Sequence, residues 1–216
     1  MKRGPQRSSV LPVPSKETIV SVFATLRRYM KTNIIIDSTM TSAQALKQNP
    51  ENNCPQEIMD ELAVLNVEYI SFDDQFHRGQ IVVHRKLKSD ITGAFRLLRE
   101  ERFPLQTVIP ISDDRYLWDD TPSTQKNNTS AFNYRFERNT NIVSNHAYGR
   151  AIDINPKLNP YFHKNAVFPE GSSYNPNIPG TIREDSILVK YFKDLGWDWG
   201  GDWDGNKDYQ HFEKLI

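Results

Sequence analysis

Two short motifs carry the side chains of this sequence that could do chemistry. Residues 144–153 read Ser-Asn-His-Ala-Tyr-Gly-Arg-Ala-Ile-Asp, and residues 208–211 read Asp-Tyr-Gln-His. They offer two histidines and two carboxylates, and they contain no thiol. Catalytic zinc sites use three ligands from His, Asp or Glu and keep a fourth position for water. The motifs therefore predict one zinc ion held by His146, Asp153 and His211, with Asp208 left over as a general base.

The spacing of the first motif requires a change of direction between its two ligands. Side chains alternate along a strand, so His146 and Asp153, seven residues apart, would face opposite sides of a straight strand. Gly149 lies between them and can supply a turn or a bulge. Residues 151–154 then alternate apolar and polar positions, which predicts a short strand that presents Asp153.

In the second motif, Asp208 and His211 are three residues apart. One helical or 3₁₀ turn would place them on a common face. This motif ends a tryptophan-rich segment whose indoles are expected mainly to pack in the core, although one of them could line a cleft: Trp197, Trp199 and Trp203. The remaining histidines have no such neighbours and are expected to be surface or structural residues: His77, His84 and His163.

The two motifs together resemble the zinc D-alanyl-D-alanine carboxypeptidase family. That family includes vancomycin-resistance dipeptidases and carboxypeptidases, and phage L-alanyl-D-glutamate endolysins. The resemblance rests on Ser-x-His-x-x-Gly-x-Ala-x-Asp followed by Asp-x-x-His-Phe-Glu. It extends to residues 128–135, 151–156 and 196–203 and to a hairpin-like segment at 67–83, and so covers residues 55–216.

The resemblance implies a role for each matching residue. His146, Asp153 and His211 are implied as the ligands of one zinc ion, and Asp208 falls where the family has its catalytic carboxylate. Some members have glutamate there, and aspartate is more similar to the carboxypeptidase and endolysin branches.

Two further residues match family positions, and two features depart from the family pattern. Arg135 falls where the family places an arginine near the scissile carbonyl, although it could instead bind a substrate carboxylate. Ser144 is implied in substrate contact or behind the ligands. Tyr134 stands where a cysteine is common, and residues 136–141 are polar and charged rather than rich in glycine and proline. Both departures would reshape the substrate cleft.

The implied substrate is the stem peptide of peptidoglycan. A carboxypeptidase that removes terminal D-alanine is favoured, because residues 128–133 and 151–156 resemble that group most. A cell-wall endopeptidase of the L-alanyl-D-glutamate type is the alternative within the class. A zinc-containing module that binds wall peptides without cleaving them is the alternative outside it, and Asp208 beside the metal with Arg135 favours an enzyme.

Composition limits the other functions of this 216-residue chain. Lys and Arg number 27 and Asp and Glu number 27, so there is no basic surface for nucleic acid. A single cysteine, Cys54, excludes an intramolecular disulfide. No stretch approaches the roughly 20 apolar residues of a membrane span. A monomer is expected.

The chain is expected to divide at residue 54. Residues 1–54 read as an N-terminal extension in which positions 19–30 have the apolar spacing of an amphipathic helix, and residues 55–216 as the zinc peptidase domain. The first residues do not form a clean signal peptide. Access to peptidoglycan nevertheless implies a periplasmic or exported protein, or a lysin encoded by a phage.

The expected architecture is α+β, of the Hedgehog/DD-peptidase type, with helices flanking one small, mostly antiparallel sheet. Helices are predicted over residues 55–65, from 90 to before Pro104, and from 187 to Gly196 after a capping box at 181–184. Strands are predicted at 67–72, 80–83 and 107–111. Residues 127–141 are expected to be irregular with a helical turn.

Overall fold

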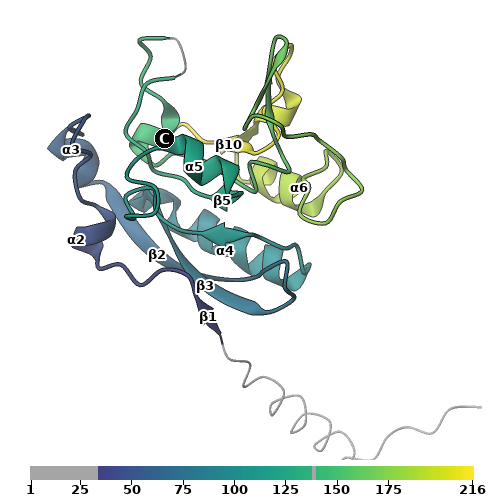
Figure 1. Cartoon of the computed structure of the whole chain (residues 1–216), viewed down its shortest axis with the longest axis horizontal. Coiled ribbons are helices and arrows are strands. Elements are labelled where there is room, and N and C mark those ends of the chain that lie inside the picture. Colours follow the sequence, from purple (N-terminus) through teal and green to yellow (C-terminus); the bar gives the residue numbers. More distant parts are fainter. Residues whose placement is uncertain (1–33, 138–139) are drawn as a thin grey trace, which may run out of the picture. The chain divides into compact units, whose positions relative to one another are not determined.

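The computed structural model describes residues 34–137 and 140–216, which combine short helices with small sheets (Figure 1). The α-helices are α2 (Ser42–Ala45), α3 (Gln56–Met59), α4 (Lys88–Glu100), α5 (Asp120–Gln125) and α6 (Ile187–Asp194). The 3₁₀ helices are η1 (Arg85–Leu87), η2 (Asn145–Tyr148) and η3 (Gly200–Asp202). The predicted α+β class is confirmed.

The strands are short, apart from one long hairpin. They are β1 (Ile35–Ile36), β2 (Leu62–Ile70), β3 (Phe76–His84), β4 (Thr107–Val108), β5 (Asn128–Thr129), β6 (Ala151–Asp153), β7 (Tyr161–His163), β8 (Ala166–Phe168), β9 (Asp198–Trp199) and β10 (His211–Glu213). They form sheets of order β1-β3-β2, β6-β10-β9, β4-β5 and β7-β8.

The prediction of one mostly antiparallel sheet is wrong, because the described strands form separate sheets and two of these contain a parallel pair. β1 runs parallel to β3, and β4 runs parallel to β5. Parallel neighbours need a crossover connection, and α5 lies on the connection between β4 and β5. The sequence pattern of such short strands does not specify their partners.

Residues 34–216 form one compact unit. Residues 34–54, which the sequence placed in the extension, contribute β1 and α2 to it, and Ala45 and Cys54 are buried in a core cluster with Met59 and Leu62. The amphipathic helix predicted at 19–30 lies outside the described residues. The division of the chain at residue 54 into an extension and a catalytic domain stays a prediction.

The β2–β3 hairpin is the largest element of the fold. Its register pairs Leu62 with His84 and Ile70 with Phe76. Both predicted strands are present with other bounds: β2 begins before residue 67 and ends at Ile70, short of residue 72, and β3 extends beyond 80–83 at both ends. The helix expected at 55–65 ends at Met59, because the residues from Leu62 onward pair with β3 instead, so tertiary pairing overrides the local helical pattern.

A layer of helix covers one face of this hairpin, with α4 packed on β2 and α6 packed on α4 (Figure 1). α4 buries Ile91, Ala94, Phe95 and Leu98, which recur at helical spacing. Ser186 caps α6, because its hydroxyl accepts from Val189 N at 3.3 Å, so the capping box predicted at 181–184 is wrong. Gly196 follows the helix with φ +79°, as expected of a residue that stops it.

Gly79 in β3 lets β4 approach the hairpin closely. A Cβ at Gly79 would lie 2.1 Å from the carbonyl oxygen of Val108. This contact matters for the rest of the fold, because β4 pairs with β5, and β5 leads into the segment at 130–135 that is hydrogen-bonded to His146.

The carboxylate of Asp90 ties α4 to the C-terminal strand. Asp90 Oδ2 accepts from Trp197 Nε1 at 2.9 Å and from Lys214 Nζ at 3.0 Å. Burial opposes the charged form of Asp90, but these hydrogen bonds outweigh it and lower the pKa of the carboxyl group. Lys214 directly follows β10, so Asp90 fixes the end of that strand.

Asp90→Ala should destabilise the protein by about 2–3 kcal/mol at pH 7, because it leaves a buried indole N–H and an ammonium group without their acceptor. Because the pKa of Asp90 is lower in the folded state, its contribution to the free energy of unfolding is present above the unfolded pKa of about 3.9. This contribution is lost as pH falls through the folded pKa. The free energies of unfolding of parent and variant, measured with urea at several pH values, should therefore converge in acid. Asp194→Ala, which removes an exposed partner of Lys190, is the control and should change little. A difference that persists undiminished at acid pH would contradict this account.

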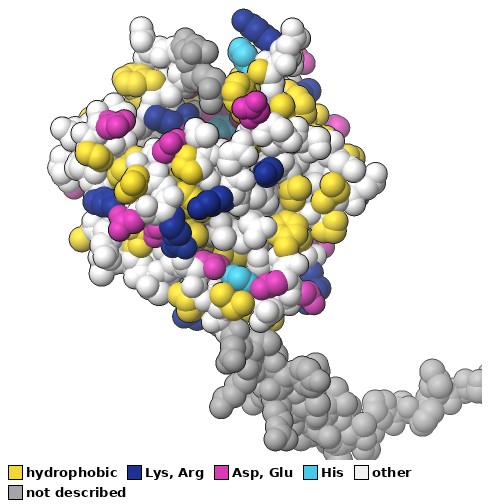
Figure 2. Space-filling view, viewed as in Figure 1, with side chains coloured by type: hydrophobic (Ala, Val, Ile, Leu, Met, Phe, Trp, Pro, Cys, Tyr) yellow, Lys and Arg dark blue, Asp and Glu magenta, His cyan; other side chains and the backbone are white. Residues whose placement is uncertain are grey.

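The surface seen in Figure 2 carries Lys, Arg, Asp and Glu side chains interspersed. This distribution agrees with the equal numbers of basic and acidic residues in the sequence. Among the described residues, no helix has the length and apolar character that crossing a membrane requires.

Candidate metal centre

His146 lies in η2, and the ends of this short helix position it. The Ser144 hydroxyl caps η2 by accepting from His146 N at 3.3 Å. Gly149 ends it with φ +63°, and a Cβ there would lie 2.6 Å from His84 N. The turn predicted at Gly149 is thus present, and both the positive φ and the close approach require glycine.

The ring of His146 has a defined tautomer. Its Nδ1 lies 2.5 Å from the carbonyl oxygen of Ala131. A carbonyl oxygen only accepts, so Nδ1 carries the proton and donates it. The lone pair of Nε2 is therefore free to face the other two residues. Asp153 Oδ2 and His211 Nδ1 each lie 3.2 Å from this nitrogen.

Asp153 ends the predicted short strand, now β6. Its backbone exchanges two hydrogen bonds with Ser130, at 2.8 and 3.1 Å, and its Cα lies opposite that of His211 on β10. The antiparallel register therefore makes two residues that are distant in sequence direct cross-strand neighbours. Asp153 Oδ1 lies 3.0 Å from His211 Nδ1.

His211 is held from its far side by Glu213. His211 Nε2 donates to Glu213 Oε2 at 2.9 Å, and the same oxygen accepts from Asn145 Nδ2 at 2.8 Å. Residues two apart on a strand share a face, so both side chains of β10 point the same way while Phe212 enters the core. This hydrogen bond leaves Nδ1 of His211 to face the cluster.

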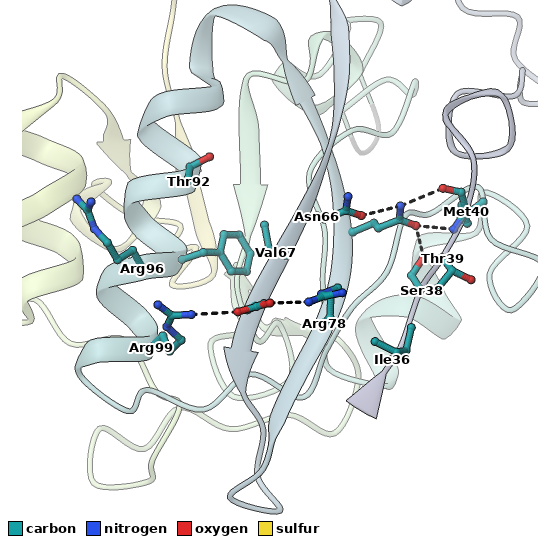
Figure 3. Close-up of a pocket in the computed structure, with 13 residues that line it drawn as sticks. Ile36, Ser38, Thr39, Met40, Asn66, Val67, Arg78, Thr92, Arg96 and Arg99 are labelled. Carbon is teal, nitrogen blue, oxygen red and sulfur yellow. Dashed lines mark hydrogen bonds and ion pairs between the residues drawn. The ribbon is translucent and has the colours of Figure 1, made fainter. Parts of the chain in front are cut away.

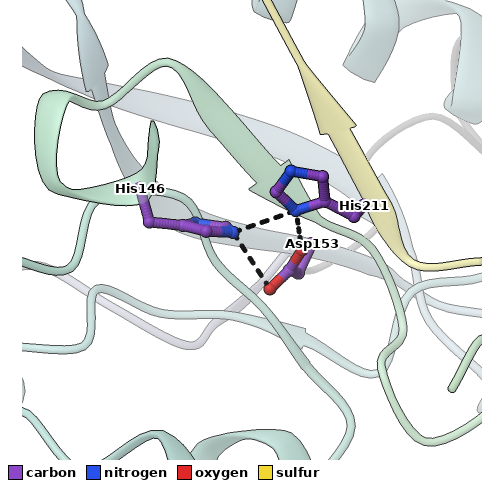
Figure 4. A group of neighbouring side chains, drawn as sticks. All are labelled: His146, Asp153 and His211. Atoms are coloured by element: carbon purple, nitrogen blue, oxygen red, sulfur yellow. Dashed lines mark hydrogen bonds and ion pairs between the residues drawn. The ribbon is translucent and has the colours of Figure 1, made fainter. Parts of the chain in front are cut away.

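The three side chains converge on one point, as Figure 4 shows, and one donor atom from each lies within 4.8 Å of the others. Ligands about 2.0–2.1 Å from a tetrahedral zinc ion lie roughly 3.3 Å apart. The observed separations of 3.0–3.2 Å are close to that value. Two imidazole nitrogens and one carboxylate oxygen also form a typical catalytic zinc donor set, so these residues fit the metal that the sequence predicted.

The electrostatics of the cluster are those of a cation site. Burial opposes the charged form of Asp153, but the two histidines outweigh it and hold the pKa of this carboxyl group far below its usual range. Burial likewise opposes the imidazolium form of His211, but hydrogen bonds to Asp153 and Glu213 raise its pKa to about 10. A proton and a metal ion therefore compete for the same nitrogen.

Asp208 lies beside the cluster. His211 N donates to Asp208 O at 3.3 Å, which is the predicted tight turn. Burial raises the pKa of the Asp208 carboxyl group to about 7, and the three residues of the cluster act on it electrostatically. Its Oδ1 is buried and has no hydrogen-bond partner among the described residues, whereas a hydrogen bond from the side chain of Gln210 opposes the rise in the pKa of the carboxyl group. A buried carboxylate oxygen is thus present beside the three residues of the cluster.

Arg135 is connected to the segment of His146 through its backbone. Arg135 O accepts from Ser144 N at 3.1 Å, two residues from His146. The guanidinium group forms an ion pair with Asp120, at 2.7 Å from Nε to Oδ2. Sequence reasoning missed Asp120, which lies 15 positions before Arg135 and has no recognisable motif.

Trp197 and Trp199 are buried in the core, whereas Trp203 is partly exposed, with its ring 5.4 Å from that of His211. His77 and His84 are buried structural residues, and His163 is a partly exposed residue of β7.

Glu213 is the second residue whose role sequence reasoning missed, although it stands in the quoted Asp-x-x-His-Phe-Glu motif. Strand alternation could have revealed it, because it lies two residues after His211. Glu213→Gln should lower zinc affinity by about 10–100-fold, since groups that orient a ligand histidine typically contribute that much. Competition with a fluorescent chelator measures this, and Glu184→Gln on the exposed surface is the control. Unchanged affinity would show that Glu213 does not tune His211.

A cavity of about 760 Å³ lies away from this cluster, between β1, the β2–β3 hairpin and α4 (Figure 3). Glu68 pairs there with Arg78 at 2.8 Å and with Arg99 at 3.1 Å. Gln80 bonds to Ser38, Met40 and Asn66. The named carboxylate, guanidinium and amide groups of this cavity therefore bond to one another.

Comparison with protein families matches residues 137–214 to the family described as D-alanyl-D-alanine carboxypeptidase. The matched segment contains His146, Asp153, His211 and Asp208, and the resemblance inferred from the motifs is confirmed there. Comparison with curated proteins and with solved structures gave no match.

Proposed function

We propose, from the match of residues 137–214 to the D-alanyl-D-alanine carboxypeptidase family, that this chain is a zinc-dependent peptidase of peptidoglycan stem peptides. The preferred activity is removal of the terminal D-alanine. The observation that carries the proposal is the convergence of His146, Asp153 and His211, each with a donor atom turned to one point. A Hedgehog/DD-peptidase fold is part of the same proposal.

The chemistry follows from the residue types around that point. When bound, a zinc ion polarises the scissile carbonyl and lowers the pKa of water from about 16 towards ~7. Asp208 would accept the proton of the attacking water and pass it to the leaving amine, a role worth about 10²–10⁴-fold in rate. Its buried Oδ1, free of hydrogen bonds to the described residues, supports this role.

Arg135 would stabilise the negative charge that develops on the scissile carbonyl oxygen. A guanidinium group stays cationic and donates to oxygen anions in a fixed geometry. Asp120 orients this group through the 2.7 Å ion pair. Ser144 would act indirectly, because its hydroxyl caps the helix that carries His146.

The proposed substrate lies outside the cytoplasmic membrane, so we propose that the protein reaches it by export, or by release if it is a phage lysin. A monomer suffices for the proposed chemistry, because all of the residues named above come from one chain.

Mass spectrometry of defined muropeptides tests the proposal directly. The purified protein is incubated with them alone, with a chelator, and with zinc added back after the chelator. Metal-dependent loss of one terminal alanine is the expected result. Metal-dependent release of an internal fragment would assign the endopeptidase activity instead. Bound zinc with no cleavage would overturn the peptidase proposal and favour a module that binds wall peptides.

A further inference from the structure

The β7–β8 hairpin is attached to the segment that carries Asp208. Tyr161 of β7 and Asp208 form an antiparallel pair. One backbone hydrogen bond lies on each side of this pair, from Phe162 N to Lys207 O at 2.7 Å and from Tyr209 N to Pro160 O at 3.4 Å. The hairpin, green in Figure 1, thus lies directly beside the yellow segment that leads to β10.

The geometry of this pair brings two side chains together. Because the hydrogen bonds flank Tyr161 and Asp208, the pair is of the non-hydrogen-bonded kind, in which the Cα atoms lie about 4.5 Å apart. Residues directly opposite each other in antiparallel strands point to the same face. The side chain of Tyr161 is therefore the cross-strand neighbour of the Asp208 carboxyl group.

The opposite face of the hairpin attaches it to the core. Neighbours along a strand point to opposite faces, so Phe162 and Tyr209 lie on the other side. Their rings meet edge-on with centroids 6.1 Å apart, while Tyr209 stacks on Tyr174 at 3.8 Å and packs against the core. Tyr161 and Asp208 consequently lie on the face that is turned away from this packing.

Tyr161 and Phe168 form a pair of rings on that face, which we call the aromatic face. Phe168 is the partner of Tyr161 in the β7–β8 register, and the ring centroids are 6.3 Å apart. Both side chains are only partly buried, so part of the ring surface is open to a ligand. The Tyr161 hydroxyl has His163 Nδ1 as a partner at 3.0 Å, so a ligand would contact the ring.

Asp208 is held between this hairpin and Gly200. Asp208 N donates to Gly200 O at 3.0 Å, and a Cβ at Gly200 would lie 2.8 Å from Asp208 Cβ. Asp208 also lies close enough to all three residues of the cluster for their charges to act on its carboxyl group. The carboxyl group is therefore next to the cluster, and the Tyr161 side chain is next to the carboxyl group.

The proposed reaction brings one part of the substrate to Asp208. A base that passes a proton to the leaving amine must come within about 3 Å of that nitrogen. The residue that carries this nitrogen, which we call the leaving residue, must then lie beside the side chains that surround Asp208. Tyr161 is the neighbour that β7 supplies.

We propose that the aromatic face binds the leaving residue and that the Tyr161 ring limits the size of its side chain. A methyl group, as in D-alanine, fits beside the ring, whereas a larger side chain collides with it. The proton transfer by Asp208 rests on the proposed function. The placement of Tyr161 beside Asp208 does not, because it follows from the strand pairing.

Tyr161→Ala tests the limit on size, with stem peptides that differ only in their last residue, D-alanine or D-phenylalanine. Loss of the ring should lower kcat/KM for terminal D-alanine by about tenfold, because one apolar contact is lost, and should raise it for terminal D-phenylalanine. The ratio of the two values should therefore fall by at least about tenfold. Tyr161→Phe keeps the ring and should keep the ratio. Changes on the acyl side of the cleaved bond should affect parent and Tyr161→Ala alike.

Phe162→Ala is the matched control, because it removes a ring from the same strand but from the opposite face. It should lower the melting temperature and leave the ratio as in the parent protein. A ratio that falls equally in Phe162→Ala would show that only the stability of the hairpin matters, and would overturn the proposal. If Tyr161→Ala does not fold, Tyr161→Leu replaces it and should change the ratio in the same direction.

A binding measurement separates this inference from the proposed function. The chain has nine tyrosines, and in protein labelled with fluorotyrosine the ¹⁹F signal that is absent from Tyr161→Phe identifies Tyr161. In the zinc-loaded full chain carrying Asp208→Asn, a stem pentapeptide ending in D-alanine should shift that signal. The signal of Tyr69, which is fully buried, should stay in place.

The outcomes are distinct. Cleavage by the parent protein with an unchanged ratio in Tyr161→Ala, or with no Tyr161 shift, would overturn this role of the aromatic face and leave the peptidase intact. A Tyr161 shift without cleavage would reject the peptidase and support the aromatic face as a surface that binds the terminal residue. Neither shift nor cleavage would overturn both.

Discussion

Replacing His146 with alanine is expected to remove both the bound metal and the activity. The ring supplies one of three donor atoms, and Nδ1–H on Ala131 O holds it in place. A site reduced to Asp153 and His211 lacks the three protein ligands of a catalytic zinc site. The metal contributes several kcal/mol to transition-state stabilisation, so turnover should fall by at least about a thousandfold. Metal content by mass spectrometry and hydrolysis of muropeptides measure the two losses.

His163→Ala is the matched control, because this histidine lies in β7 and is not part of the cluster. It should keep one zinc ion per chain and full turnover. Circular dichroism of the His146→Ala protein checks that the fold survives. Tight zinc binding retained by His146→Ala would reject the assignment of ligands.

Asp208→Asn is expected to separate metal binding from turnover. The change keeps the size of the side chain but removes its ability to accept a proton. Turnover should fall by about 10²–10⁴-fold, the usual contribution of a general base. Zinc content should stay near that of the parent protein, because Asp208 is not among the three donors of the cluster.

Asp204→Asn provides the comparison for this variant, since Asp204 is an exposed aspartate on the same segment. Its turnover should stay within about twofold of the parent, as for most surface substitutions. Persistent turnover in Asp208→Asn would mean that another group accepts the proton. Loss of zinc in the same variant would mean that Asp208 supports the ligands rather than the reaction.

The three residues of the cluster could be predicted from the sequence because the motifs that contain them are local. The motif at 144–153 contains two of them together with the glycine that turns the chain between them, and Gly149 does adopt a positive φ. The tight turn from Asp208 to His211 is also local. Periodicity likewise predicted α4 and the hairpin, since each contains enough residues to show its pattern.

Pairings between distant segments could not be predicted in the same way. Asp153 and His211 are 58 positions apart, and the contact depends on how β6 meets β10. Strands of two or three residues carry too little alternation to specify a partner, which is why the parallel pairs were missed. Asp120 was missed for a similar reason, because its role depends on Asn133 and Arg135 from another segment.

The register that places Asp153 opposite His211 has a consequence for the dynamics of the chain's end. A cation bound by both residues would join β6 to β10 by a link stronger than their backbone ladder alone. Opening of β10 would then require release of the ion, so zinc should slow hydrogen exchange of its backbone amides. Zinc should therefore change the protection of β10 more than that of β2 or β3, which carry none of the three donor atoms.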